Sequence, residues 1–168
     1  MYELLKNTDA RTMPAEASRM EILLFSLGTD DTFGINVFNV REVCKTPAIT
    51  RAPHMPDGVE GLISLRGNII PVVSLAKAMH LTDAPPGRGE SMMVIEYGER
   101  TFGFLVHGVD RIISVDRDRV LAPEVVASGT RTYITAMTKL DSGGLVSIVD
   151  VEVLADTLRP LLLNARRN

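Results

Sequence analysis

The sequence predicts a mostly β-stranded protein with two similar lobes, and three observations lead to this expectation. Many short apolar runs lie close together and are separated by turns that contain glycine, which is typical of small barrels or sandwiches. The pattern F-G-x-x-V-x-x-V-x-x-[VI] occurs twice, starting at Phe33 and at Phe102, an offset of 69 (102 minus 33). A second echo relates residues 72–75 to residues 148–151. Self-similarity of this kind usually reflects duplication of one structural unit, and two copies predict two lobes that share a core.

The first half of the chain is expected to form two hairpins. Turn residues at 28–31 and at Arg66-Gly67-Asn68 join the strands in pairs, because glycine and asparagine suit the conformations of tight turns. Residues 39–45 fit a short helical turn slightly better than a continued strand. A short helix over 76–81 and a linker over 82–90 complete this half. The predicted strands are residues 22–27, 33–37, 59–65 and 69–75.

The second half repeats this scheme and ends in a helix over 152–158, which Pro160 terminates. The predicted strands here are residues 92–97, 101–106, 111–115, 131–140 and 145–149. We therefore expect an N-terminal arm over 1–20, a domain over 21–158 and a C-terminal tail over 159–168. Within the domain, the predicted subdomains are about 21–84 and 91–151.

Composition excludes several classes of protein. The 168 residues are 45% apolar, which predicts a globular chain, and the net charge of −3 argues against binding to nucleic acid or to an anionic membrane. Cys44 is the only cysteine, so no intramolecular disulfide can form. The start of the chain does not resemble a signal peptide, and no apolar run is long enough to cross a bilayer. We expect a cytoplasmic protein without membrane insertion.

Motifs for catalysis, cofactors or metals are missing from the sequence. The three histidines lie far apart and lack acidic or cysteine neighbours at the spacing of metal ligands. There is neither a glycine-rich phosphate loop nor a G-x-S-x-G turn. The sequence therefore predicts a binding module and not an enzyme. Two alternatives stay open: a flavin-dependent oxidoreductase on a small split barrel, and a peptide-binding β-barrel module of another kind.

Arg66 is the most distinctive loop residue because it lies at a predicted hairpin tip between apolar strands. A guanidinium forms directional hydrogen bonds and packs well at interfaces, so Arg66 is a candidate anchor for a partner. A solvated turn arginine explains the same pattern equally well.

An ordered series of segments resembles the CheW-like domain of bacterial chemotaxis. Residues 19–25 and 33–43 also resemble the amino-terminal half of CheV proteins, which looks like the nearest relative. The matching segments are residues 22–27, 33–43, 61–67, 70–75 and 149–151, with Gly103, Val106, Gly108 and Val109.

This resemblance implies an all-β fold of two five-stranded SH3-like barrels packed side by side, with short helices that include a C-terminal one. It also implies an adaptor without a cofactor that couples methyl-accepting chemoreceptors to the histidine kinase CheA. Such an adaptor lies in the cytoplasm, at receptor arrays on the inner membrane. CheV proteins continue into a receiver domain, but only eight residues follow Pro160, so we expect no receiver in this chain.

The resemblance further assigns residues to receptor binding. It implies that Arg66 is important for this binding, that Val40 and Val43 are apolar contacts, and that Glu42 is a polar partner. The residues expected to shape the loop are Gly61, Gly67 and Ser64, where Ser64 replaces the usual asparagine.

Overall fold

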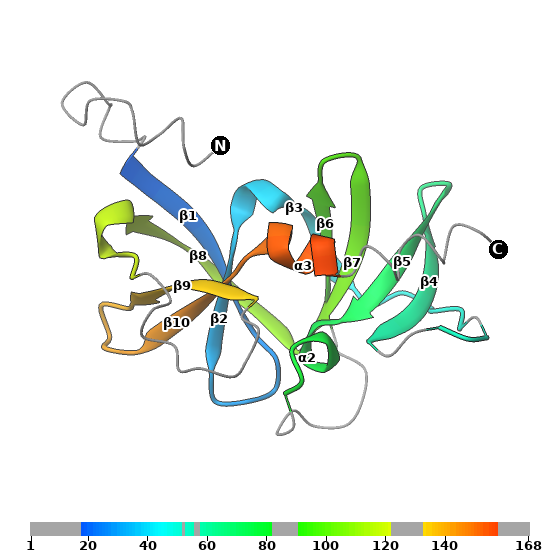
Figure 1. The fold of residues 1–168 in the computed structure, drawn as a ribbon, viewed down its shortest axis with the longest axis horizontal. Helices are drawn as coiled ribbons and strands as arrows, with labels where there is room; N and C mark the ends of the chain where they lie inside the picture. The colour runs from blue at the N-terminus through cyan, green and yellow to red at the C-terminus, as the bar shows by residue number, and fades with distance from the viewer. Residues whose placement is uncertain (1–17, 52, 56–57, 82–90, 122–132, 158–168) are drawn as a thin grey trace.

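The computed structural model describes residues 18–51, 53–55, 58–81, 91–121 and 133–157, and this part of the chain forms two five-stranded sheets side by side (Figure 1). The expected mostly-β fold with a few short helices is confirmed. The strands are β1 (Arg19–Ser26), β2 (Thr32–Asn36), β3 (Val40–Lys45), β4 (Val59–Leu65), β5 (Asn68–Ser74), β6 (Ser91–Tyr97), β7 (Arg100–Val106), β8 (Gly108–Asp116), β9 (Ile134–Lys139) and β10 (Leu145–Val149). The helices are η2 (Val37–Asn39), α2 (Leu75–Ala78), η3 (Arg117–Arg119) and α3 (Val151–Thr157).

The strand order shows that the two halves of the chain exchange strands. The first sheet has the order β8-β1-β2-β10-β9, and the second has the order β3-β6-β7-β5-β4. Each sheet thus combines two strands from one half of the chain with three from the other. The predicted subdomain boundaries, 21–84 and 91–151, do not correspond to the two sheets. The chain changes sheet after β2, through η2, and again after β7, at His107.

Two smaller expectations also need correction. The segment that was expected to favour a helical turn, residues 39–45, is mostly the strand β3, and the helical turn is the preceding η2. The Asn36 side chain accepts a hydrogen bond from the Phe38 backbone N–H at 3.0 Å, which stabilises this turn. The predicted arm over 1–20 extends two residues too far, because β1 starts at Arg19. Residues 1–17 and the predicted tail lie outside the described residues.

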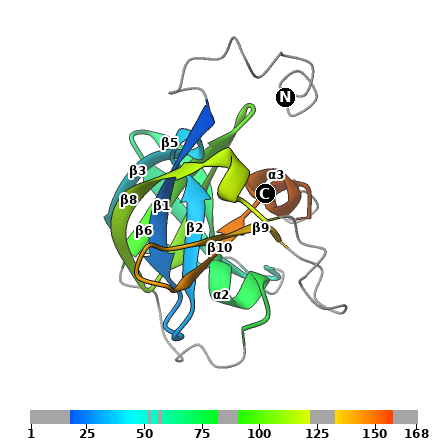
Figure 2. The ribbon, with the colours of Figure 1, turned by 90° about the vertical axis from the view of Figure 1, so that its left-hand side faces the viewer.

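Three apolar clusters explain why the central strands are apolar at nearly every position. Leu23 and Phe25 of β1 face the core between the sheets, whereas Ile22 and Leu24 face a core inside the first sheet. The strand is buried on both faces, so its side chains do not alternate between apolar and polar. β6 does the same in the second sheet. Helices α2 and α3 contribute Leu75 and Leu154 to the shared core and lie beside it in both views (Figures 1 and 2).

The repeated glycine of the F-G pattern occupies equivalent places in the two sheets. Gly34 lies in β2 and Gly103 in β7, the middle strand of each sheet. A Cβ on Gly34 would lie 2.5 Å from the Ile22 Cγ2, and one on Gly103 would lie 2.6 Å from the Met92 Sδ. Both would enter the core that each sheet encloses. The missing side chains let each sheet curl tightly, as glycine does at the corners of barrels.

The sheets are nevertheless open, and the expectation of closed barrels is wrong. In the described residues no ladder joins the edge strands β3 and β4, or β8 and β9. A single bridge, Thr50 to Leu62, connects the chain beyond β3 to β4, and a single bridge, Leu121 to Met137, connects the chain beyond β8 to β9. We call the gap between the edge strands the seam of each sheet.

Candidate functional site

The turn between β4 and β5 projects Arg66 from the second sheet. Leu65 pairs with Asn68, so Arg66 and Gly67 are the two turn residues, and their φ angles are 49° and 82°. Two positive φ angles in a two-residue hairpin define a type I′ turn, whose twist matches that of the strands. Glycine adopts this conformation freely, but for arginine it costs about 1 kcal/mol. The backbone therefore holds Arg66 at the tip at some cost in stability.

Gly61 and Ser64 lie in the strand that leads to this turn. The φ angle of Gly61 is 152°, and a Cβ there would collide with the carbonyl oxygen of Thr50 and lie 2.6 Å from the Ile49 Cγ2. Glycine at this position thus allows the close approach of the chain after β3 that forms the Thr50–Leu62 bridge. Ser64 is exposed and pairs with Ile69 across the hairpin.

Arg66 and Glu42 meet across the seam of the second sheet. The Arg66 Nη2 donates to the Glu42 Oε2 at 2.6 Å, although Glu42 lies on the edge strand β3 and Arg66 on the hairpin at the other end of the strand order. The Arg66 side chain is 65% exposed and that of Glu42 is 22% exposed. The carboxylate thus orients the guanidinium, while most of the arginine faces solvent. Among the described residues the Arg66 guanidinium makes this one hydrogen bond, so its other N–H donors are available to a partner.

Burial and the charges of Glu42 and Arg66 all affect the pKa of the Cys44 thiol. Burial raises the pKa of Cys44 above its ordinary value of 9.0, the charge of Glu42 raises this pKa further, and the charge of Arg66 lowers it. Cys44 packs against the core inside the second sheet. The neutral thiol is therefore the form present near neutral pH, which suits an inert core residue better than a nucleophile.

A β-bulge puts Val40 and Val43 on one face of β3, opposite to Glu42. Val40 pairs with Ile95, Glu42 with Val94 and Val43 with Met93, with a register shift between Val40 and Glu42. Cross-strand partners project to the same side of a sheet, so the two valines share the side of Ile95 and Met93. Val40 packs against the core between the sheets, whereas Val43 is 44% exposed. The structure brings Glu42 and Arg66 together and places the valines on the other face.

Phe38, which the sequence pattern does not single out, is 89% exposed on η2 at the crossover between the sheets. Its sequence context, between Val37 and Val40, is that of a core residue, so the pattern contains no signal for this exposure. A phenylalanine with so little burial contributes little to folding and is well suited to contact a partner. It lies two residues before Val40.

The described residues contain no group of three or more His, Cys, Asp or Glu side chains that could hold a metal ion. An oriented arginine and exposed apolar side chains are typical of a recognition surface.

A family model for the CheW-like domain matches residues 21–159. The chain belongs to the CheW-like family. The predicted resemblance is confirmed, and it decides against the oxidoreductase and the unrelated barrel module. Proteins of the CheW-like family are chemotaxis adaptors and not enzymes.

Both groups named by the resemblance occur among the similar proteins. The chemotaxis protein CheW of Klebsiella aerogenes is 28% identical over 143 residues, covering 84% of this chain and 85% of that protein. The chemotaxis protein CheV3 of Helicobacter pylori is 30% identical over 130 residues, covering 76% of this chain and 42% of that protein. The crystal structure of the scaffolding protein TtCheW from Thermoanaerobacter tengcongensis matches with a TM-score of 0.72 at 28% identity, covering 80% of this chain and 91% of that one. In the part of the CheW-like domain that the structure describes, no helix has the length and apolarity needed to traverse a bilayer.

Proposed function

We propose that this CheW-like domain couples the cytoplasmic tips of methyl-accepting chemoreceptors to the histidine kinase CheA by binding both proteins. The observation that carries the proposal is the family match over residues 21–159, which covers both sheets. The oriented, solvent-exposed Arg66 at the seam supports the proposal, because interfaces often use an arginine of this kind as a contact residue. The domain acts through its surface and needs no cofactor.

The receptor contact is proposed to combine Arg66 with the outer part of β3. Glu42 holds one edge of the guanidinium, and Arg66 donates its other N–H groups to a polar or carbonyl group on the receptor. Val43, with the half-buried Val40, offers apolar surface to the stripe of a receptor helix, and the exposed Phe38 extends this surface.

An interface of standard size buries about 800 Å² on each partner, yet its affinity can be only micromolar because association costs entropy. Packing of many copies in a receptor array then supplies avidity.

We propose that the domain is located at such arrays on the inner membrane. Coupling means that receptor signalling changes which state of the kinase the assembly favours.

Receptor binding is tested with Arg66→Glu in calorimetry against a purified cytoplasmic receptor fragment. The charge reversal removes the proposed donor and repels Glu42, so we expect at least a tenfold weaker affinity. Arg100→Glu is the matched control, because Arg100 begins β7 in the β6–β7 hairpin, which belongs to the same sheet as the β4–β5 hairpin of Arg66. Unchanged receptor affinity for Arg66→Glu, with a normal circular dichroism spectrum and melt, would exclude Arg66 from the contact.

A second titration, of the unmodified domain with the regulatory domain of CheA, tests the coupling itself. We expect saturable binding, and a complex of receptor fragment, adaptor and kinase that elutes together in size-exclusion chromatography. If no CheA binding is seen while the receptor fragment binds, the coupling role is refuted even though the receptor contact stands.

A further inference from the structure

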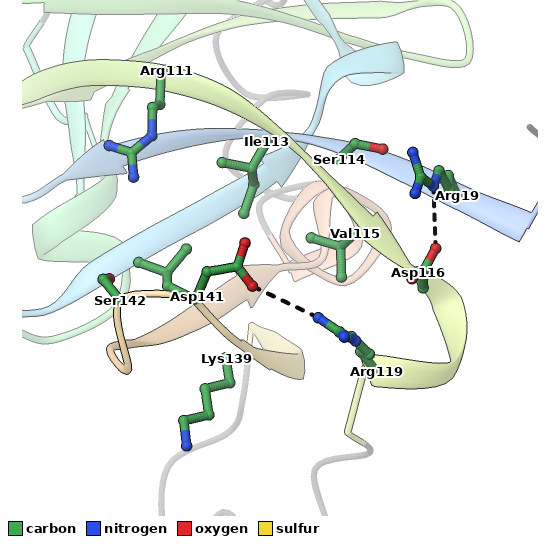
Figure 3. A pocket seen from close by; sticks show the side chains of 11 residues that line it. Arg19, Arg111, Ile113, Ser114, Val115, Asp116, Arg119, Lys139, Asp141 and Ser142 are labelled. Carbon is green, nitrogen blue, oxygen red and sulfur yellow. Dashed lines mark hydrogen bonds and ion pairs between the residues drawn. The ribbon is translucent and has the colours of Figure 1, made fainter.

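The seam of the first sheet contains a cleft of about 510 Å³ that the proposed receptor contact does not use. It lies between the edge strand β8 and the turn after β9, and Figure 3 shows it from close by. Its walls come from four separate parts of the first sheet: β1, β8 with η3, the end of β9, and the β9–β10 turn. Its lining includes Arg19, Arg111, Ile113, Val115, Arg119 and Lys139.

The floor of the cleft is apolar because the open seam leaves the side of the inner core uncovered. Val115 belongs to this core, and Ile113 and Leu140 pack against it. Ile113 and Val115 are two residues apart on β8, so they project to the same face, and both point into the cleft in Figure 3. An apolar side chain from a ligand can pack on this floor.

The rim of the cleft is basic, although the whole chain has a net charge of −3. Four cationic side chains and two carboxylates line it, and a third carboxylate, that of Asp110, pairs with Arg111 at 2.8 Å, which leaves a local excess of one positive charge (4 minus 3). Arg19 pairs with Asp116 at 3.2 Å and Arg119 with Asp141 at 3.7 Å. Lys139 forms no ion pair with a described residue. The cationic groups stand at separate corners of the cleft in Figure 3, so they suit several spaced carboxylates better than one small anion.

The two seams are related by the internal repeat. In the second sheet, Glu42 near one edge pairs with Arg66 on the β4–β5 turn. In the first sheet, Arg119 beyond the edge strand β8 pairs with Asp141 on the β9–β10 turn. An ion pair therefore spans each seam with the charges interchanged, although Glu42 lies on β3 itself and Arg119 lies on η3, beyond β8. Since the first seam also carries Lys139, which has no ion pair with a described residue, its charge favours a partner of acidic character.

We propose that this cleft binds an extended acidic segment of a partner protein, in which carboxylates alternate with apolar residues. The apolar side chains pack on Ile113 and Val115, and the carboxylates pair with Lys139, Arg111 and Arg119. β8 is an edge strand, so every second residue presents its backbone N–H and C=O to the seam, and an extended segment can pair with them. This proposal does not depend on the receptor contact at Arg66.

The test uses a short fluorescein-labelled peptide of alternating glutamate and valine, titrated with the full chain and followed by fluorescence anisotropy. We expect saturable binding that weakens as the ionic strength rises, because exposed charges are screened. The double variant Arg111→Glu, Lys139→Glu should bind at least tenfold more weakly. The control Lys45→Glu, on the edge strand of the second sheet, should bind as the unmodified chain does. Circular dichroism melts verify that each variant is folded.

Two further peptides and one small anion make the result decisive. Replacing valine by serine should weaken binding because the floor then has no apolar partner, and replacing glutamate by lysine should abolish it. Inorganic phosphate should not compete with the peptide, and amide shifts in ¹⁵N spectra should fall on β8 and the β9–β10 turn. The proposal is overturned if no saturable binding occurs, if Lys45→Glu is as damaging as the double variant, if phosphate competes, or if the serine peptide binds as tightly.

Discussion

Gly34→Ala tests the physical meaning of the duplicated F-G pattern. The new Cβ would lie 2.5 Å from the Ile22 Cγ2 and 3.0 Å from the Val146 Cγ1, where an ordinary contact is 3.4–4 Å. Ile22 and Val146 are fully buried and β-branched, so neither can move aside by changing rotamer. Overpacking of this kind costs about 1–3 kcal/mol, and the loss of chain entropy in the unfolded state offsets about 0.4–1 kcal/mol. We therefore expect a net loss of about 1–2 kcal/mol.

Gly103→Ala is the matched variant at the equivalent position of the second sheet. Its Cβ would lie 2.6 Å from the Met92 Sδ and 3.3 Å from the Val72 Cγ2. A methionine side chain is unbranched and adapts its shape, so the cost should be smaller than at Gly34. Urea denaturation followed by circular dichroism measures both values, since the chain has no tryptophan. The reasoning fails if Gly34→Ala is as stable as the unmodified chain, or if Gly103→Ala is the more damaging change.

Three further predictions concern single side chains. Arg66→Gly relieves the strain of the positive φ angle of 49° but removes an exposed ion pair. These effects oppose each other, so the free energy of unfolding should change by less than about 1 kcal/mol, while receptor affinity falls. A large destabilisation in a thermal melt would show that the ion pair is structurally essential. Thr138→Val should stabilise the chain by about 1 kcal/mol, because the buried Thr138 hydroxyl has no hydrogen-bond partner among the described residues. A lower melting temperature for this variant would contradict the prediction. The pKa of Cys44 in the folded chain is raised above the ordinary value of 9.0. The stability that this shift contributes is fully present below pH 9.0 and is lost as the pH rises through the raised pKa. The free energy of unfolding should therefore fall in alkaline solution. The rate of thiol modification against pH should place the Cys44 pKa above 9.0 and higher still in Arg66→Gly, and a midpoint that does not move would refute the influence of Arg66.

The two ion pairs show how duplication produced different surfaces from one plan. Each hairpin tip pairs across a seam with the chain at or beyond an edge strand, but the signs of the charges, the partner element and the distance differ. A duplicated unit can thus retain its packing while its two seams diverge in charge, because exposed ion pairs contribute little to stability.

The local pattern of the sequence determined most of the strands and the presence of a tight turn after Leu65, whereas the structure showed that Arg66 and Gly67 are its two turn residues. Apolar runs, glycine and asparagine act over a few residues, so each hairpin can be predicted from its own segment. The error at residues 39–45 arose because a bulge makes Val40 and Val43 share a face as they would in a helix. The internal repeat predicted the two lobes, and the resemblance to the CheW-like domain added the expected role of Arg66 in receptor binding.

Only the tertiary structure decided which strands pair across the halves of the chain, and with it the composition of both seams. Backbone hydrogen bonds are nearly the same for any pair of strands, so the partner of β3 or β8 depends on which apolar faces the whole fold must bury. The pairing of Glu42 with Arg66, the exposure of Phe38 and the meeting of Arg19 with Lys139 at one cleft all follow from this exchange of strands. Residues so far apart in the sequence carry no local signal that they will become neighbours.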